Sequence, residues 1–404
     1  MPSLTRVAVH NLVRTPRRSA MISAAVVVGC AAMIFMHAMN NGFADMLITN
    51  STGLMLGHVQ VDAADGARTL DSGPVLAAAA QVPEIAGAAP RLEVPALVGA
   101  IGTTRGAVLL GVDAAREAAA STFPTLVVEG RFPSGGDSIA LGVDLARAVH
   151  AKVGDALPVA YLDAADAYQK ATLPIVGLIR TGSEELDAKL ALVPIATARR
   201  LFDEDATTGA QRIVVKARTN ALADDAAARL RSRLDARRYR VRTWREVSPF
   251  LAGLVAYQYG SINVVLLVMY VIVGAGVAAI QVMGVLERTR EFGVLSAIGF
   301  TPSRVVLLIA LETLFLGVVA VAAGVLFGSA LVSFVNHAGG LDVRLAGGDH
   351  LEGLMGLDPH LRPVGSLRGT LAAIGLVVPV LLLGGLLPAL RAARMTPMEA
   401  LRRT

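Results

Sequence analysis

The charged residues best placed for specific chemistry form a cluster between two long apolar runs. The stretch LERTREFGVLSAIGFTPSR occupies residues 286–304, and its charged side chains near the start are Glu287, Arg288, Arg290 and Glu291. Its apolar and small residues favour one helical face and include Phe292, Leu295, Ile298 and Gly299. The pattern predicts a short amphipathic helix at 287–304. Such a helix either lies at a lipid interface or binds in a groove of a partner protein.

One carboxylate stands inside an apolar run, Glu312 in the stretch LLIALETLFLG. An ionisable residue within a membrane span is a candidate site for a substrate or for protons. Glu312 lies about two helical turns beyond Arg304. At that depth it can instead stabilise packing beneath the amphipathic helix, and we favour this structural role.

The sequence contains no recognisable pattern for catalysis, ATP binding or metal binding. A phosphate-binding loop requires a lysine directly after a glycine. None of the lysines follows a glycine; they are Lys152, Lys170, Lys189 and Lys216. Three of the seven histidines, His337, His350 and His360, stand near acids, but their spacing matches no known ligand pattern. We expect no catalytic residue, no metal and no cofactor in this chain.

The charged cluster must be positioned by membrane-spanning elements. The 404 residues are 54% hydrophobic and 4% aromatic, and their mean hydropathy is +0.58. This is more apolar than the composition of typical soluble domains. Four runs are long enough to cross about 30 Å of hydrocarbon, and they are residues 19–40, 261–286, 305–335 and 369–390.

Arginine placement predicts the topology of these spans. Residues 1–18, the segment 287–304 and the tail 391–404 are rich in arginine. The positive-inside rule places all three in the cytoplasm, with 1–18 as an amphipathic elbow. Four crossings then put both termini in the cytoplasm, and residues 41–260 and the loop 336–368 outside. The net charge of +5 therefore indicates topology and contact with anionic lipid rather than nucleic-acid binding.

The first apolar run allows a second interpretation. Val27-Val28-Gly29-Cys30 is a loose lipoprotein-processing motif that follows arginines. Because apolar residues continue past Cys30 through AAMIFMHAM, we favour a retained span. A lone cysteine cannot form an internal disulfide, so the outside block must fold without one.

The block 41–260 has the pattern of a folded α+β domain. Near its start, HVQVDAA (58–64) and RLEVPALVGAIG (91–102) predict strands around a helix in GPVLAAAAQV (73–82). Near its end, residues 212–217, 221–238 and 239–244 repeat the strand–helix–strand order. The two units predict one shared sheet with helices on one face. Short strand patterns in 103–205 predict an inserted second lobe, and the segments next to the spans continue either as helices or as loops.

The charged stretch and the run after it resemble a known family. ERTREFGVLSAIGFTPSRVVLLIALETLFLGVVAVAAGVLFG (287–328) is similar to the signature region of FtsX-type ABC permeases, which include MacB and the lipoprotein-releasing Lol permeases. Other similar stretches occur in the family's order along nearly the whole chain, five of them before residue 287 and one after residue 328. They are AMNNGFADMLITNSTGLMLGHVQV, RGAVLLGVD, VEGRF, KVGDALPV, IVGLIRTGSEELD and ARMTPMEALR. Two departures are Ser296, where relatives often have arginine, and the short hairpin tip 161–170. This tip lacks the longer Hook by which one Lol permease recruits its carrier, so the resemblance does not predict carrier capture by the tip of this chain.

The resemblance implies a type VII ABC permease in the bacterial inner membrane. Its fold would be an α-helical membrane protein with four transmembrane helices plus an α+β periplasmic domain. That domain would have a Porter lobe at about 55–102 and 206–245 and an inserted Sabre-like lobe at about 103–205. The segment 287–304 would be the coupling helix that binds an ATPase. The eight residues named first above would then be its ATPase-coupling residues.

The implied function is that of a permease subunit that couples cytoplasmic ATP hydrolysis to periplasmic movement and extracts lipoproteins or lipids toward the outer membrane. The implied partners are a dimer of ABC ATPase subunits that bind ATP and Mg, a second permease copy or paralogue, and a periplasmic carrier or adaptor. Candidate substrate-contacting residues on the first two spans, which can equally serve ordinary packing, are Ile34, Phe35, Met39, Phe43, Met46, Leu47, Val264, Leu267 and Val268. The alternatives are a MacB-like exporter of peptides or small molecules and an FtsX-like activator of a cell-wall hydrolase.

Overall fold

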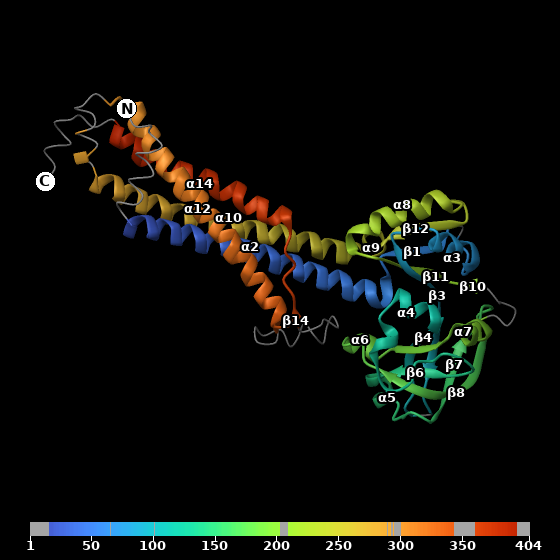
Figure 1. Cartoon of the computed structure of the whole chain (residues 1–404). Coiled ribbons are helices and arrows are strands. Elements are labelled where there is room, and N and C mark those ends of the chain that lie inside the picture. Colours follow the sequence, from blue (N-terminus) through green and yellow to red (C-terminus); the bar gives the residue numbers. More distant parts are fainter. Residues whose placement is uncertain are drawn as a thin grey trace. The chain divides into compact units, whose positions relative to one another are not determined.

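The computed structural model describes residues 16–64, 66–100, 102–202, 209–288, 290, 291, 294, 300–342 and 360–393. The chain forms two compact units (Figure 1). A helical unit contains Met1–Ala44, Ala256–Leu341 and Leu361–Thr404. An α/β unit contains Asp45–Val255 and Asp342–His360.

Four long helices build the helical unit: α2 (Pro16–Ser51), α10 (Pro249–Glu287), α12 (Pro302–His337) and α14 (Leu367–Ala393). Three stretches are long and apolar enough to cross a membrane by length and composition, namely Ser19–Leu56, Pro249–Gly284 and Ser303–His337. The apolar stretch of α14 is shorter where its side chains are described, Leu367–Leu383. The fourth span therefore stays a prediction.

Two helices run well past the predicted spans. The 36 residues of α2 correspond to about 54 Å of helix, against about 30 Å of hydrocarbon. It continues to Ser51 rather than ending near Asn40, and α10 already begins at Pro249 rather than at Ser261. Of the helix and loop interpretations left open for these flanking segments, the structure shows helix.

Side chains from all four helices share one apolar core, which includes Val26, Met33, Leu266, Tyr270, Ala320 and Val377. Glycines allow α12 to approach α2 closely within it. A β-carbon at Gly324 would lie 2.7 Å from Cys30 Cβ, and one at Gly328 would lie 3.0 Å from Ala31 Cα. These glycines are four residues apart, on one helical face, as in the close crossings of membrane helices.

The α/β unit contains a ten-stranded sheet, and one part of it, which we call the four-stranded sheet, is antiparallel with the order β12-β1-β11-β3. Its strands are β12 (Tyr239–Thr243), β1 (Val59–Ala63), β11 (Arg212–Ala217) and β3 (Ile85–Val98). Helices α3 (Ser72–Ala80) and α8 (Ala223–Arg233) pack on the face of Ile213 and Val215. The two sequence-distant strand–helix–strand segments thus share a sheet, as predicted.

The prediction that helices cover one face only is wrong. Val214 points away from the face of Ile213 and Val215, because side chains alternate along a strand. It is buried with Ala89 and with Ala120 of α4 (Ala114–Ala120). A β-carbon at Gly87 would meet the backbone of Ala119 at 2.6 Å. Helix α4 therefore covers the second face, and Gly87 permits its close approach.

Further strands close a ring with β3, in the order β3-β4-β9-β6-β8-β7 and back to β3. They are β4 (Arg105–Val112), β9 (Leu190–Pro194), β6 (Ile139–Gly142), β8 (Tyr168–Ile179) and β7 (Ala156–Leu162). Alternate residues such as Val94, Leu109, Leu141, Val159 and Ile175 fill its interior. Helices α5 (Val143–Ala148) and α7 (Ile195–Phe202) contribute Leu145 and Ala198 to the same core.

The remaining described elements are short: η1 (Thr52–Leu56), β2 (Leu70–Asp71), η2 (Phe123–Leu126), β5 (Val127–Gly130), α6 (Glu184–Asp187), β10 (Gly209–Ala210), η3 (Asn220–Leu222), α9 (Trp244–Val247), β13 (Leu341–Asp342) and β14 (His360–Leu361). The strand that joins the two parts of the unit is β3. Its first half pairs with β11 and its second half with β4, and Arg91 pairs with both.

Candidate functional site

The structure describes half of the predicted coupling residues. Glu287, Arg290 and Glu291 are exposed, as expected for residues that contact a partner. Phe292, Leu295, Ile298 and Gly299 lie outside the described residues. The predicted helix at 287–304 therefore stays a prediction, whereas Pro302 does begin α12 as the Thr-Pro pair indicated.

Arg288 differs from its charged neighbours because its side chain points toward α12 and is largely buried. Its side chain is 14% exposed, and its Nη1 lies 3.2 Å from Glu312 Oε2, in a carboxylate whose side chain is 10% exposed. Its Nε donates to Glu291 Oε2 at 2.8 Å. The Arg288 guanidinium thus joins the start of the charged segment to α12. Because Glu312 has a cationic partner, the geometry favours the structural role predicted for this carboxylate.

A second polar contact joins α10 and α12 close to this ion pair. Gln281 Nε2 donates to Thr313 Oγ1 at 3.0 Å, and the Thr313 hydroxyl donates to the Ile309 carbonyl at 2.9 Å. Gln281 and Thr313 are both buried. Sequence analysis missed this pair, although a glutamine in the apolar stretch VAAIQVMG and a threonine beside Glu312 were the available signals.

The predicted substrate-contacting residues fall into two groups. Val264, Leu267 and Val268 of α10 are 62%, 61% and 52% exposed. On α2, Phe35, Met39, Phe43 and Met46 are half-buried, whereas Ile34 and Leu47 are buried. Ile34 packs against Gly328, since a β-carbon there would lie 3.2 Å from Ile34 Cβ. Ile34 therefore takes part in helix packing. The three α10 side chains are exposed, and their contact with substrate stays a prediction.

The hairpin tip between β7 and β8 is held within the α/β unit. Asp163 Oδ1 accepts from the backbone N–H groups of Ala165 and Ala167, both at 2.9 Å, and these bonds hold the pKa of Asp163 below its ordinary value. Arg68 pairs with Asp166 at 3.1 Å, and the Ala164 N–H donates to the Phe202 carbonyl at 2.6 Å. The tip is therefore a compact turn rather than an extended arm.

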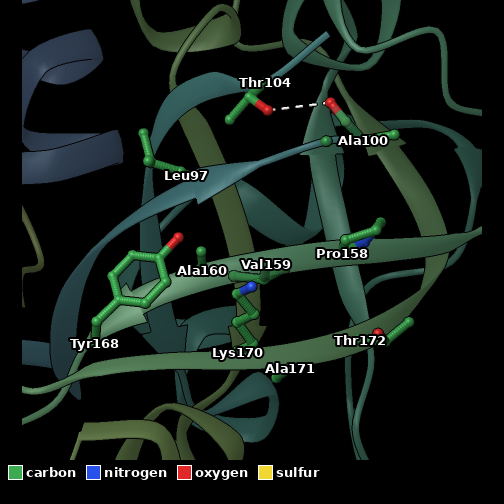
Figure 2. A pocket seen from close by; sticks show the side chains of 11 residues that line it. Leu97, Ala100, Thr104, Pro158, Val159, Ala160, Tyr168, Lys170, Ala171 and Thr172 are labelled. Carbon is green, nitrogen blue, oxygen red and sulfur yellow. Dashed lines mark hydrogen bonds between the residues drawn. The ribbon is translucent and has the colours of Figure 1, made fainter. Parts of the chain in front are cut away.

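A groove of about 770 Å³ lies on the outer side of the ring, beside β3, β7 and β8 (Figure 2). Leu97, Pro158 and Ala160 give it an apolar wall, and Lys170 and Tyr168 place an ammonium and a phenol at it. The described lining residues include no carboxylate. In size and chemistry the groove can accept an apolar group that carries a negative charge.

Comparison with known families identifies the protein class. The MacB-like periplasmic core domain family matches residues 19–233, more than half of the chain. The FtsX-like permease C-terminal family matches residues 263–397. The chain belongs to the MacB/FtsX family of ABC-transporter permeases. The resemblance found in the sequence is thereby confirmed, and families of this kind work with ABC ATPase partners.

Two relatives of the permease are lipoprotein-releasing system transmembrane proteins LolC. That of Neisseria meningitidis serogroup B is 26% identical over 79% of this chain and 78% of the relative. That of Xylella fastidiosa is 25% identical over 93% of this chain and 92% of the relative. The matches run through both units of the permease.

Two solved structures are similar to part of the permease. The periplasmic region of MacB from Actinobacillus actinomycetemcomitans is 10% identical, with a TM-score of 0.35, over 48% of this chain and 92% of that one. The extracellular domain of the noncanonic ABC-type transporter YknZ from Gram-positive bacteria is 11% identical, with a TM-score of 0.34, over 46% and 99%.

Proposed function

We propose that this permease extracts lipoproteins or lipids from the bacterial inner membrane toward the outer membrane. The observation that carries the proposal is the match to LolC of Xylella fastidiosa, which extends over 93% of this chain and 92% of the relative. A match of that length includes the spans, the outside domain and the charged segment together. It therefore supports a common working cycle and not only a common domain.

The free energy needed to extract this cargo from a bilayer is consistent with a complex that hydrolyses ATP. Removing an acyl chain from a bilayer costs about 0.8 kcal/mol per CH₂, so one long chain costs roughly 10 kcal/mol. The sequence offers no phosphate-binding lysine. We assign ATP and Mg binding to a dimer of separate ATPase subunits, which would contact Glu287, Arg290 and Glu291 on the cytoplasmic side. The exposed apolar side chains of α10, Val264 and Leu267, would face the cargo or a second permease copy.

The proposed topology has four spans with both termini in the cytoplasm. α14 is the fourth span, and the arginines of 1–18, 287–304 and 391–404 support the orientation. The sheet with α3 and α8 corresponds to the Porter lobe and the six-stranded ring to the Sabre-like lobe. A periplasmic carrier or adaptor would receive the cargo there.

The test is to identify what the working complex holds. The permease is purified with its ATPase in lipid nanodiscs, and hydrolysis is blocked with vanadate. Mass spectrometry of the trapped material should find acylated peptides or lipids in excess over a matched complex with a Walker-lysine-substituted ATPase. Recovery of soluble cargo alone would overturn the proposal.

A MacB-like exporter of peptides or small molecules is the second candidate, because the MacB-like core family matches residues 19–233. The same experiment separates the two. An exporter would hold a soluble peptide or small molecule and would copurify with an adaptor protein.

A further inference from the structure

The last turns of α2 belong to the α/β unit, which begins at Asp45, and polar contacts fasten them within it. After Ser51 the chain forms the π-helical turn η1, whose last carbonyls have no partner inside the helix. Arg91 of β3 supplies the missing donors. Its Nη1 donates to the Leu54 carbonyl at 2.6 Å and to the Met55 carbonyl at 3.2 Å. A cation at a helix C-terminus is also favoured by the helix dipole.

Glu117 of α4 fixes the Arg91 guanidinium from the other side. Arg91 Nε and Nη2 donate to the two carboxylate oxygens of Glu117 at 2.8 and 2.9 Å. The side chains are 2% and 0% exposed. Phe123 lies against the guanidinium, with its ring centroid 5.1 Å away. Such a two-pronged, fully buried pair allows few alternative geometries, so Arg91 connects η1, β3 and α4 rigidly.

A second contact fastens the preceding turns of α2. Asn220 Nδ2 donates to Asp45 Oδ1 at 2.6 Å, and its Oδ1 lies 2.5 Å from His58 Nε2. His58 Nδ1 accepts the Ala217 N–H at 3.2 Å, so the proton of the neutral ring is on Nε2 and is donated to Asn220. A shift of the last turns of α2 would therefore break this partly exposed contact at Asp45 as well as the buried bonds of Arg91.

The position of Arg91 decides what such a shift would move. It lies where β3 leaves its pairing with β11 and enters its pairing with β4. A displacement of η1 therefore acts at once on the four-stranded sheet, on the ring and, through Glu117, on α4. Apolar packing would permit sliding at this point, whereas a buried ion pair penalises it strongly.

We propose that Arg91 is the positioning residue through which movement of α2 reaches the α/β unit, with Glu117 holding its guanidinium in place. The proposal rests on the proposed function in that α2 must move during an ATP-driven cycle. It names no cargo and can be tested without one.

The decisive variant is Arg91→Met/Glu117→Leu. It removes both charges while keeping similar volume, so neither charge is left buried and unpaired. Its matched control is Lys189→Met/Glu185→Leu, in an exposed pair whose side chains are 61% and 78% exposed. Arg91→Lys retains the charge but not the forked geometry. It serves as a second variant if the double variant does not fold, as judged from Trp244 fluorescence.

The first measurement is amide hydrogen exchange of the full chain in detergent micelles. Exchange across residues 52–58 should be at least tenfold faster in the double variant and unchanged in the control. The second measurement uses the complex with its ATPase in nanodiscs. Adding ATP should change exchange across residues 85–120 in the wild type and in the control, but not in the double variant, while ATP turnover stays within twofold.

Each outcome of the two measurements supports or overturns the role of Arg91. Unaltered exchange at 52–58 would show that Arg91 does not hold η1. An ATP response at 85–120 that is absent in the wild type, or kept in the double variant, would show that movement does not pass through Arg91. A complex that gives the expected exchange results but traps no lipid-linked cargo would leave this inference standing and overturn only the lipoprotein-release function.

Discussion

Replacing Gly324 with alanine should force α12 away from α2. The added β-carbon would lie 2.7 Å from Cys30 Cβ and 3.2 Å from the Val27 carbonyl oxygen. Non-bonded carbon atoms normally stand about 3.5–4.0 Å apart, so the two helices must separate by roughly 1 Å or bend. Overpacking of this kind costs about 1–3 kcal/mol. At 1.4 kcal/mol per factor of ten, the opened arrangement becomes about 5- to 140-fold more populated.

The chain contains its own reporter for this opening. Cys30 is the single cysteine and is fully buried at the contact. Alkylation of a thiol requires access of the reagent to the thiolate. Labelling of the full chain by N-ethylmaleimide in mild detergent, followed by intact mass, should therefore accelerate about 5- to 140-fold in Gly324→Ala.

Gly276 provides the matched control. It lies in α10, and a β-carbon there would meet nothing within 4 Å. Gly276→Ala should leave Cys30 labelling unchanged and stabilise its helix by up to about 1 kcal/mol. Equal labelling rates in Gly324→Ala and Gly276→Ala would refute the glycine-mediated contact between α2 and α12.

Three further predictions follow from the described contacts. Glu312→Gln removes the charge of the buried carboxylate that Arg288 contacts, leaving the exposed Glu291 as its ionic partner, and should destabilise the helical unit by up to about 3 kcal/mol. Arg288→Met/Glu312→Leu should recover much of this loss in thermal unfolding followed by circular dichroism. Glu287→Ala/Arg290→Ala should abolish copurification of the ATPase while Trp244 fluorescence stays native, and retained binding would indicate that the segment only lies at the lipid surface. Burial lowers the pKa of His58 below its ordinary value of 6.5, so the unfolded chain takes up a proton that the folded chain resists, and stability should fall as pH drops below about 6.5. His58→Gln should remove this dependence from guanidinium titrations, and a wild-type titration that is flat over this range would contradict it.

Local patterns predicted most strands because alternation of apolar and polar residues is a property of each strand alone. RIVVKA was predicted as a strand at 212–217, and β11 has these bounds. β3 begins at Ile85, earlier than the predicted residue 91, because the small residues Ala86–Ala89 show no alternation. β9 shows no such alternation, because LALVP is apolar at every position, as is usual for a strand buried on both faces.

Local sequence patterns could not predict which strands pair or which charged side chains form ion pairs. β9 pairs with β4 in parallel across some eighty residues of chain, and the ring closes only when β7 returns to β3. Arg91 and Glu117 are 26 residues apart, and Glu117 stands in AAREAAA, which has the pattern of an exposed helix. Nothing in either segment indicates that both side chains are buried and share one site.

The four helices differ in how closely they pack, and under the proposed function this difference decides where a lipid-linked cargo would have room. α12 closes on α2 through Gly324 and Gly328, where backbone and β-carbons meet. α10 reaches the common core through Leu266, Tyr270 and Val277, and its remaining faces expose Val264, Leu267, Val268, Val271 and Ile272. Lipid tails are as apolar as these side chains, so the hydrophobic effect does not decide what covers them.

One end of α10 is nevertheless fixed. Gln281 bonds to Thr313, and Arg288 just beyond the helix pairs with Glu312, so both contacts join this end to α12. A force applied to the charged segment by an ATPase would act next to these bonds. We therefore expect α10 to move least at Gln281 and most toward Val264, where its apolar side chains are uncovered. Under the proposed function, an acyl chain beside Val264 and Leu267 would be displaced by a helix that rotates about the polar contacts near Gln281, and α2 and α12 could stay in contact throughout.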